Sequence, residues 1–257
     1  MPELPEVETL CRQLQKKIAG KKISDSEAYD SKLAHIRNLK GRTIVAVRRN
    51  GKMIEIILND GHSVLIHLRM TGRLLWQEES VRPKHSRWRI SLAYGNLYLV
   101  DPRRFATVSV SPAEDADEGN DLIHNFDEQA FIASHGRRKT KVKNLIMDQK
   151  AVSGIGNIYA CEILHAAGVH PETMAADLTK KDWAKIFRIA KKILTKAIEK
   201  RGTSISDWRD LNGLKGENQF ELKAYGQEGK KCIKCGGTIS RIKQGGRSTF
   251  YCPVCQQ

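Results

Sequence analysis

The 257-residue sequence has no apolar run approaching the roughly 18 residues that a membrane-spanning helix needs. Its first residues, Met1-Pro2-Glu3-Leu4-Pro5-Glu6, are acidic where a signal peptide is basic and then apolar. Internal repeats are also absent. We therefore expect a cytoplasmic protein without membrane segments, long enough to bury one large core or two modest ones.

Acidic residues are scarce relative to basic ones, 29 against 44, which leaves a formal net charge of +15. Such an excess favours a polyanionic partner, because phosphates that a protein neutralises release their condensed counterions. The charge alone does not distinguish DNA from RNA, and it is also compatible with a solvated surface or with ribosomal or membrane association. It indicates a class of partner and no more.

The first part of the chain predicts one helix and then a β-rich region. Apolar residues recur at helical spacing at Val7, Leu10, Leu14 and Ile18, so we expect a helix over about residues 5–19, preceded by a short stub. Short β-rich runs separated by turn signals follow at Thr43–Val47, Met53–Leu58, Ser63–Leu68, Trp88–Leu92, Leu97–Val100 and Thr107–Val110. Strands at this spacing indicate a sandwich or a barrel.

An acidic, polar stretch from Ser111 to Asp121 predicts a linker, and the pattern beyond it is helical. Helices are expected over Ala130–Ser134, Val142–Asp148, Ile158–Ala167 and Lys180–Lys200. Thr179 is placed to cap the last of these helices and Gly202 to end it. Residues 203–231 lack periodicity and are numerous enough to suggest a functional loop.

Four of the six cysteines lie in the last 26 residues, as Cys232-x2-Cys235-x16-Cys252-x2-Cys255. In a cytoplasmic chain, two CxxC pairs at this spacing indicate a tetrahedral zinc site, which is structural because the protein supplies all four ligands. Glycines between the pairs predict a hairpin, and basic residues surround its tip at Arg241, Lys243 and Arg247. The hairpin either binds a phosphate backbone or simply staples the C-terminus.

Removal of Met1 exposes the prolyl amine of Pro2 beside the carboxylate of Glu3. An α-amino group is roughly a tenth neutral at pH 7, whereas a lysine is neutral in about 0.04% of molecules. A secondary amine also gives a permanently charged iminium on a sugar carbon, and this electron sink permits elimination of the neighbouring phosphates. Glu3 is close enough to shuttle protons.

Several specific motifs run through nearly the whole chain. They are Pro2-Glu3-Leu4-Pro5-Glu6-Val7-Glu8-Thr9, Arg48-Arg49-Asn50-Gly51-Lys52, His67-Leu68-Arg69-Met70-Thr71-Gly72-Arg73-Leu74, Lys84-His85, Asp101-Pro102-Arg103-Arg104-Phe105, Asp148-Gln149, Gly154-Ile155-Gly156-Asn157-Ile158-Tyr159-Ala160 and the terminal Cys252-Pro253-Val254-Cys255-Gln256. Together they resemble the formamidopyrimidine-DNA glycosylase branch of the Fpg/Nei family. The Nei branch typically begins Pro-Glu-Gly-Pro-Glu, so Leu4 favours the formamidopyrimidine branch.

The resemblance implies an α+β fold in three parts. An N-terminal β-sandwich with flanking helices would carry catalysis (1–117), followed by a helix–two-turns–helix DNA-binding domain (118–228) and a four-cysteine zinc ribbon (229–257). The family binds double-stranded DNA with a damaged base in the cleft between its domains. We expect a monomer of bacterial type, associated with the nucleoid.

The resemblance also assigns roles residue by residue. Pro2 would attack the deoxyribose C1′ and form a Schiff base, with Glu3 as general acid/base and Glu6 as an orienting carboxylate. Lys52 would hold a phosphate and assist β-elimination, and Arg247 would complete the phosphate grip and assist δ-elimination. The family's other DNA contacts match His67, His85, Arg103, Lys139 and Asn157, and the zinc ligands match Cys232, Cys235, Cys252 and Cys255.

Met70, Arg103 and Phe105 resemble the family's wedge, which fills the hole that an extruded base leaves in the stack. The chain departs from the family pattern beside this wedge. It has Ser86-Arg87 where Asp-His is expected, Ala106 where many relatives have Gly, and Met53 where they have Tyr. Leu211 to Tyr225 corresponds to the mobile loop that covers the flipped base in the family.

The sequence therefore predicts a bifunctional glycosylase/AP lyase for oxidised purines such as 8-oxoguanine and formamidopyrimidines, with one structural zinc ion. Three alternatives stay open. They are the same chemistry on oxidised pyrimidines, a zinc-ribbon protein that binds lesions without catalysis, and an RNA-binding ribbon protein.

Overall fold

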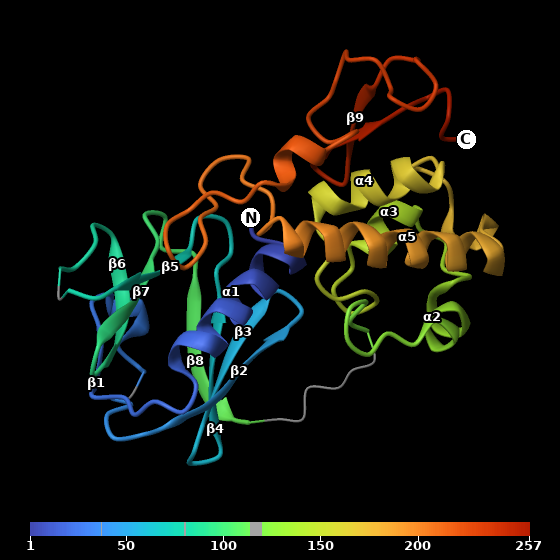
Figure 1. Cartoon of the computed structure of the whole chain (residues 1–257). Helices are drawn as coiled ribbons and strands as arrows, with labels where there is room; N and C mark the ends of the chain where they lie inside the picture. Colours follow the sequence, from blue (N-terminus) through green and yellow to red (C-terminus); the bar gives the residue numbers. More distant parts are fainter. Residues whose placement is uncertain (37, 80, 114–119) are drawn as a thin grey trace. The chain divides into compact units, whose positions relative to one another are not determined.

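The computed structural model describes residues 1–36, 38–79, 81–113 and 120–257 (Figure 1). By its internal contacts the chain forms two compact units. The first unit combines Met1–Ala116 with Lys200–Glu217, and the second combines Asp117–Glu199 with Asn218–Gln257. The acidic centre of the predicted linker, residues 114–119, lies outside the described residues. The functional division at residues 117 and 228 stays a prediction.

The expected N-terminal helix is present as α1 (Leu4–Ile18). Its buried face includes Leu10, Leu14 and Ile18, all fully buried, which is the stripe that the spacing predicted. A capping box between Glu3 and Glu6 satisfies backbone N–H groups at its start, and Pro5 lies in its first turn. The helix therefore begins immediately after the Pro2-Glu3 stub.

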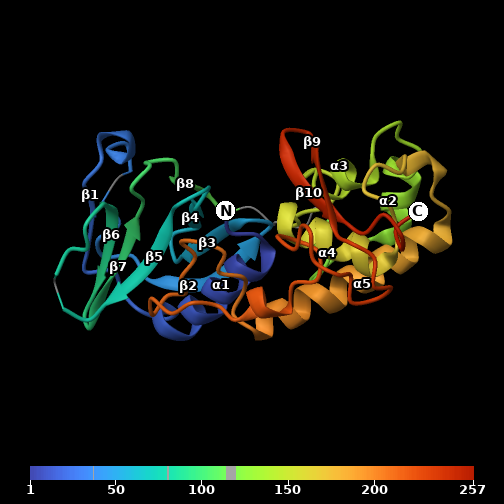
Figure 2. The same ribbon diagram turned by 90° about the horizontal axis from the view of Figure 1, so that it is seen from above.

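Two four-stranded antiparallel sheets complete the first unit (Figure 2). One has the order β1-β6-β7-β5 and the other the order β2-β3-β4-β8. The strands are β1 (Asp25–Ala28), β2 (Ile44–Asn50), β3 (Met53–Leu58), β4 (His62–His67), β5 (Arg73–Gln77), β6 (Ser86–Leu92), β7 (Gly95–Val100) and β8 (Thr107–Pro112), with a 3-10 turn η1 (Ser31–Leu33) after β1. Buried apolar residues of both sheets share one core with α1, among them Ile54, Ile66, Trp88 and Leu97. The predicted sandwich is confirmed.

The sequence did not predict the two strands β1 and β5, which each form one edge of the same sheet. β1 is only four residues long, and three of its residues, Asp, Glu and Ala, are of types depleted in strands. Its pairing with β6 is reinforced by Arg89, which binds Asp25 at 2.7 Å and Glu27 at 3.1 Å. A neighbouring strand, and not local propensity, makes β1 a strand.

The segment Lys200–Glu217 returns to the first unit after the long helix α5 (Lys180–Glu199). Trp208 and Leu211 join the core of the sandwich. Trp76 N donates to Leu211 O at 3.0 Å, and Gln13 Nε2 on α1 donates to Asp210 Oδ2 at 3.0 Å. The first unit therefore contains residues about 200 positions apart in the sequence.

The second unit contains the remaining helices and the C-terminal ribbon. Besides α5, they are α2 (Glu128–His135), α3 (Val142–Ile146), α4 (Asn157–Ala167) and the 3-10 turns η2 (Ala175–Asp177) and η3 (Asn218–Glu221). Thr179 and Asp182 cap α5 reciprocally, since Thr179 N donates to Asp182 Oδ2 at 2.9 Å and Asp182 N to Thr179 Oγ1 at 3.2 Å. None of the helices in the described part of the chain is long and apolar enough to cross a membrane.

The ribbon hairpin consists of β9 (Ser240–Gln244) and β10 (Arg247–Tyr251). Its turn residues Gly245 and Gly246 have φ values of +55° and +75°, which a two-residue hairpin turn of this kind requires. The hairpin that these glycines predicted is confirmed. The ribbon packs on α4, where Cys161 contacts a small core that includes Ile239 and Phe250.

Candidate functional site

The N-terminal stub is buried and tied down, where a chain terminus is ordinarily frayed. Glu3 N donates to Glu6 Oε2 at 2.7 Å, and Thr203 N donates to Glu6 Oε1 at 2.7 Å. A Cβ at Gly202, where φ is +78°, would lie 2.7 Å from that same Oε1 atom. Glu6 therefore joins the stub that carries Pro2 to the returning segment of the chain.

The turn between β2 and β3, which carries Lys52, is connected to the start of α1 by a buried ion pair. Arg49 Nε donates to Glu8 Oε2 at 2.8 Å, and the Arg49 side chain is fully buried. Arg49 also donates from Nη1 to Gly51 O at 3.1 Å. Burial alone raises the pKa of Glu8, but its bonds to Arg12 and Arg49 outweigh burial and lower it. The Lys52 turn and the Pro2 stub are thus anchored to one helix.

His67 ends β4 and pairs with Met53, the residue after Lys52. Burial, followed by the charges of Arg69 and Lys52, lowers the pKa of His67 to about 4. Arg69 N donates to His67 Nδ1 at 3.0 Å, so the neutral ring has its proton on Nε2. At neutral pH His67 is therefore an uncharged hydrogen-bond donor next to a lysine.

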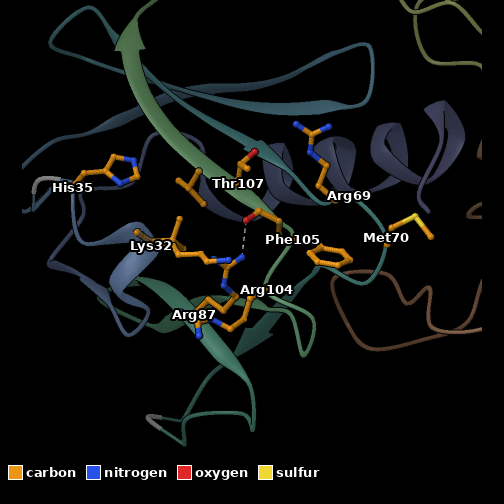
Figure 3. Close-up of a pocket in the computed structure, with 11 residues that line it drawn as sticks. Lys32, His35, Arg69, Met70, Arg87, Arg104, Phe105 and Thr107 are labelled. Carbon is orange, nitrogen blue, oxygen red and sulfur yellow. Dashed lines mark hydrogen bonds between the residues drawn. The ribbon is translucent and has the colours of Figure 1, made fainter.

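Met70 and Phe105 expose large apolar side chains, 50% and 47% of their surface. The Arg103 guanidinium carbon lies 4.6 Å from the centroid of the Phe105 ring. Both exposed side chains line one pocket of the first unit (Figure 3). The structure therefore brings the three predicted wedge residues into two adjacent loops.

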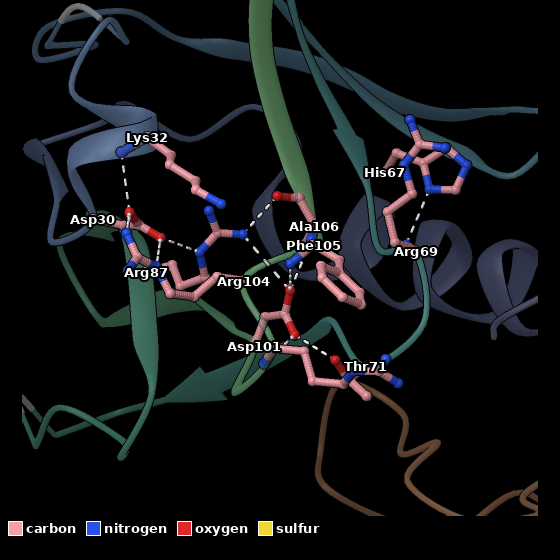
Figure 4. A network of polar contacts seen from close by, with 11 residues as sticks. Asp30, Lys32, His67, Arg69, Thr71, Arg87, Asp101, Arg104, Phe105 and Ala106 are labelled. Carbon is pink, nitrogen blue, oxygen red and sulfur yellow. Dashed lines mark hydrogen bonds and ion pairs between the residues drawn. The ribbon is translucent and has the colours of Figure 1, made fainter.

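Asp101 connects those two loops (Figure 4). Its Oδ1 accepts from Thr71 Oγ1 at 2.5 Å, and its Oδ2 accepts from the backbone N–H groups of Phe105 and Ala106, each at 2.7 Å. Burial raises the pKa of Asp101, yet these donors together lower it, so the carboxyl is held as an anion. The Met70 loop and the Phe105 loop are thus fixed to one carboxylate.

Among the residues that the structure describes, Arg69 and Arg104 in these two loops have positive φ, +56° and +57°, and so does His85 in the loop before β6, at +65°. A positive φ costs energy for a residue that has a Cβ. Residues in such strained conformations tend to cluster at functional sites. His85 is held by its carbonyl, which accepts from Asp101 N at 3.0 Å. The surrounding hydrogen bonds and ion pairs must therefore hold these three residues in their strained backbone conformations.

A second carboxylate, Asp30, neutralises two arginines beside the wedge (Figure 4). Arg87 Nε binds Asp30 Oδ2 at 2.6 Å, and Arg104 Nε binds the same atom at 2.9 Å. Arg87 also donates to Ala106 O at 2.6 Å and lies 3.6 Å from Asp101. The bond to Arg104 is the largest contribution that lowers the pKa of Asp30.

In the second unit, Asn157 at the start of α4 is bound to the ribbon hairpin. Asn157 Nδ2 donates to Ser248 O at 2.8 Å. The buried Lys143 donates from Nζ to Asn157 Oδ1 at 2.5 Å and to Thr249 Oγ1 at 2.8 Å. Arg247 is the exposed first residue of β10, directly before Ser248. Lys143 therefore ties Asn157, a predicted phosphate contact, to the hairpin that carries Arg247.

The four cysteine Sγ atoms of the ribbon lie within 4.8 Å of one another and form no disulfide. Two pairs are 3.8 Å and 3.5 Å apart, Cys232–Cys255 and Cys235–Cys252. Tetrahedral zinc with bonds of about 2.3 Å separates its sulfurs by about 3.8 Å, so these donors fit a zinc ion. His165 Nε2 on α4 lies 3.3 Å from Cys232 Sγ, a neighbour of the kind that orients metal ligands.

Comparison with known families agrees with this geometry. The model of the formamidopyrimidine-DNA glycosylase N-terminal domain matches residues 1–108, that of the formamidopyrimidine-DNA glycosylase H2TH domain matches residues 119–208, and that of a zinc finger found in FPG and IleRS matches residues 229–257. The chain belongs to the formamidopyrimidine-DNA glycosylase family.

Relatives in the family match along their whole length. The formamidopyrimidine-DNA glycosylase of Carboxydothermus hydrogenoformans is 39% identical, and that of Pelotomaculum thermopropionicum is 37% identical, with 100% of this chain covered in both and 100% and 99% of the relatives. A solved complex of a Lactococcus lactis mutant with Fapy-dG containing DNA superimposes with a TM-score of 0.91 at 34% identity over 100% of both chains. A complex of the Lactococcus lactis protein with abasic-site DNA gives 0.90 at 34% identity, with 99% of both chains covered.

Within the family pattern, the departures beside the wedge acquire a structural account. The family pattern predicted Asp-His at positions 86–87, and the chain has Ser86-Arg87. Arg87 is buried and forms an ion pair with Asp30. The Ala106 side chain packs against Gly72, because a Cβ built on Gly72 would lie 2.9 Å from the Ala106 Cβ. Met53 occupies the position opposite His67. The ion pair with Asp30 gives Arg87 a structural role at this position.

Some residues that position the site were not predicted as site residues: Arg49, Asp101, Lys143 and Glu162. Glu162 on α4 accepts from the backbone N–H groups of Lys223, Ala224 and Tyr225 at 2.9, 2.9 and 2.8 Å. It therefore holds the C-terminal end of the segment from Leu211 to Tyr225, which is predicted to cover the flipped base. Asp101 and Arg49 lay within motifs that the sequence already showed. Lys143 and Glu162 gave no signal, because a charged residue in a helix usually faces solvent. Lys139 lies exposed in the loop before α3.

Proposed function

We propose that this chain excises oxidised purines, 8-oxoguanine and formamidopyrimidines, from double-stranded DNA and then cleaves the strand. The observation that carries the proposal is the buried stub, in which Glu6 binds the backbone N–H of Glu3, next to the nucleophile, and that of Thr203 in the returning segment. Such anchoring converts a frayed terminus into a positioned amine. Family members solved with Fapy-dG and abasic-site DNA support this substrate class.

Chemically, the Pro2 nitrogen donates its electron pair to C1′, and the glycosidic bond breaks as the damaged base departs with those bonding electrons. The amine then loses its proton, and its electron pair forms the C1′=N bond as the C1′–O4′ bond of the sugar ring breaks and O4′ takes up a proton. The resulting iminium carries a permanent positive charge on nitrogen. Loss of a C2′ proton then pushes electrons toward C3′ and expels the 3′ phosphate, and a further elimination expels the 5′ phosphate. Glu3 moves protons at the amine and the sugar.

Residues in each unit would contact backbone phosphates. Lys52 and the neutral His67, which donates from Nε2, would contact phosphates beside the lesion, and Arg103 and His85 would contact the DNA near the wedge. Lys139, Asn157 and Arg247 would contribute from the second unit. Met70 and Phe105, already half exposed, would replace the extruded base in the stack.

The four cysteines would hold one zinc ion, which supplies no chemistry to the reaction and fixes the ribbon fold. The ribbon's own residues do the positioning, since Ser248 and Thr249 bind Asn157 and Lys143. We expect the protein to act as a monomer in the bacterial cytoplasm, at the nucleoid.

Borohydride trapping on a duplex with one 8-oxoguanine tests the nucleophile. Protein freed of Met1 forms a covalent complex, as verified by mass spectrometry, and neither Pro2→Gly nor protein that retains Met1 does so. Glu6→Gln serves as the matched variant, since it keeps Pro2 and changes only the anchoring carboxylate. A folded, metal-loaded and methionine-free protein that forms no complex and cuts no lesion would contradict the proposal and favour a lesion-binding protein.

Parallel cleavage assays on 8-oxoguanine and thymine-glycol duplexes test the substrate class. We expect the 8-oxoguanine duplex to be cut faster and the products to end in phosphates on both sides of a one-nucleotide gap. A preference for thymine glycol assigns the same chemistry to oxidised pyrimidines instead.

A further inference from the structure

A hollow of about 650 Å³ opens beside the wedge in the first unit (Figure 3). This volume lies within the roughly 300–1,000 Å³ typical of small-ligand sites. Leu33, Ala106 and Val108 give it an apolar floor, and Met70 and Phe105 form one wall. Nothing in the proposed excision chemistry uses the space.

The charges around the hollow are all positive. Four of its lining residues are lysine or arginine, and no carboxylate lines it. Asp30 neutralises Arg87 and Arg104 from behind. Lys32 and Arg69 are exposed and have no carboxylate within ion-pair distance among the residues that the structure describes. Arg69 lies beside His67, whose Nδ1 accepts from Arg69 N at 3.0 Å (Figure 4), so Lys32 is the cation left to an outside anion above the apolar floor.

The Lys32 end of this hollow lies across the wedge from the predicted lesion-strand contact His67. His67 lies on one side of Phe105 and Lys32 on the other (Figure 4). A wedge that fills the hole of an extruded base reaches across the stack from the lesion strand toward its complement. If Lys52 and His67 hold the lesion strand, the Lys32 side faces the undamaged strand.

We propose that the hollow binds a nucleotide of the undamaged strand, with its phosphate on Lys32 and its sugar or base against the apolar floor. Cations fix a phosphate and apolar surfaces contact the rest of a nucleotide, which matches both halves of the site. The inference rests on the proposed function, because it assumes that Met70 and Phe105 enter a duplex. It assigns recognition of the second strand to η1, which no motif of the sequence indicated.

Methylphosphonate scanning with a charge variant tests the proposal. The probe is a duplex with a tetrahydrofuran abasic analogue, in which single phosphates of either strand are replaced by neutral methylphosphonates. Lys32→Ala is compared with Lys40→Ala, an exposed lysine that does not line the hollow. Because one exposed charge contributes modestly, we expect Lys32→Ala to raise Kd about threefold to fivefold and to reduce the salt slope by about one.

The decisive result is whether the effect of a methylphosphonate on binding depends on the presence of the Lys32 side chain. One methylphosphonate in the undamaged strand weakens binding of the wild type and of Lys40→Ala, and has no further effect on Lys32→Ala. Coupling to a lesion-strand phosphate instead, or a Lys32→Ala protein that binds like the wild type, overturns the proposal. Borohydride trapping by the wild type is scored separately, so a failure of the Pro2 chemistry is distinguishable from a failure of this site.

Discussion

The two units position their functional residues by different physical means. In the first unit, buried carboxylates do so: Glu6 holds the stub, Glu8 binds Arg49 under the Lys52 turn, and Asp101 joins the wedge loops. In the second unit, a buried lysine binds an amide and a hydroxyl, and a cysteine cluster fits a metal ion. The first unit should therefore respond to charge and pH, and the second to metal.

The largest effect should come from Cys235→Ser. Structural zinc contributes roughly 10–16 kcal/mol of apparent binding free energy in small zinc domains, so loss of a ligand should unfold the ribbon. We expect zinc content and DNA affinity to fall together while the sandwich keeps its own unfolding transition. Metal analysis, anisotropy and circular dichroism measure the three quantities.

Cys11→Ala is the control for this variant, since Cys11 is buried in the first unit and is not part of the four-cysteine cluster. It should retain zinc. If DNA affinity survives in Cys235→Ser protein that has lost its zinc, the ribbon does not hold the backbone.

Arg49→Met should have the next largest effect, on the first unit alone. It leaves Glu8 as a buried carboxylate without its fully buried partner, and breaking such a pair costs about 3–5 kcal/mol. Urea unfolding measures the loss, and zinc content should not change. Arg12→Met removes the other partner of Glu8. Because the Arg12 side chain is 58% exposed, this change should lower the free energy of unfolding by about 1 kcal/mol or less. Equal losses in the two variants would show that burial does not decide the strength of these pairs.

His67 should make the first unit sensitive to acid. Its folded pKa of about 4 lies below the value of about 6.5 expected in an unfolded chain. The unfolded state therefore binds a proton first as pH falls, and stability decreases from about pH 6.5 down to about pH 4. Above that range the contribution of His67 is constant.

Titration of the His67 ring by NMR measures this pKa directly. Arg69→Ala should raise it, because removal of a nearby positive charge favours the imidazolium form. An ordinary midpoint near 6.5 would contradict the lowered pKa, and part of the rings would then be charged at neutral pH.

The smallest effect should come from Arg247→Ala, an exposed residue of the ribbon hairpin. Loss of one phosphate contact should reduce the slope of log affinity against log salt by about one unit. Stability and zinc content should stay unchanged. Arg241→Ala, at an exposed arginine that pairs with Glu228, is the matched control. An unchanged slope for Arg247→Ala would remove Arg247 from the phosphate grip.

Much of the fold followed from local patterns in the sequence. α1, α4 and α5 were predicted because their apolar stripes and caps are local signals, and six strands of the sandwich because turn residues separate them. β1 and β5 were not, since edge strands this short depend on the neighbours with which they pair. The packing of Trp208 and Leu211 into the sandwich also escaped prediction, because no pattern within residues 203–231 indicates a partner that far away.

The sequence by itself determined the chemical groups: the prolyl nitrogen, its neighbouring carboxylate, the Lys52 turn, the four thiols and the family that joins them. These are properties of residue type and spacing, which survive any detail of packing. Only the tertiary structure decided that Glu6 anchors the stub to Thr203, that Lys143 is buried against Asn157, and that Asp30 leaves Lys32 without a counter-charge. Each of these depends on distances between residues remote in the chain, which hydrophobic burial and ion pairing set together and which no local pattern encodes.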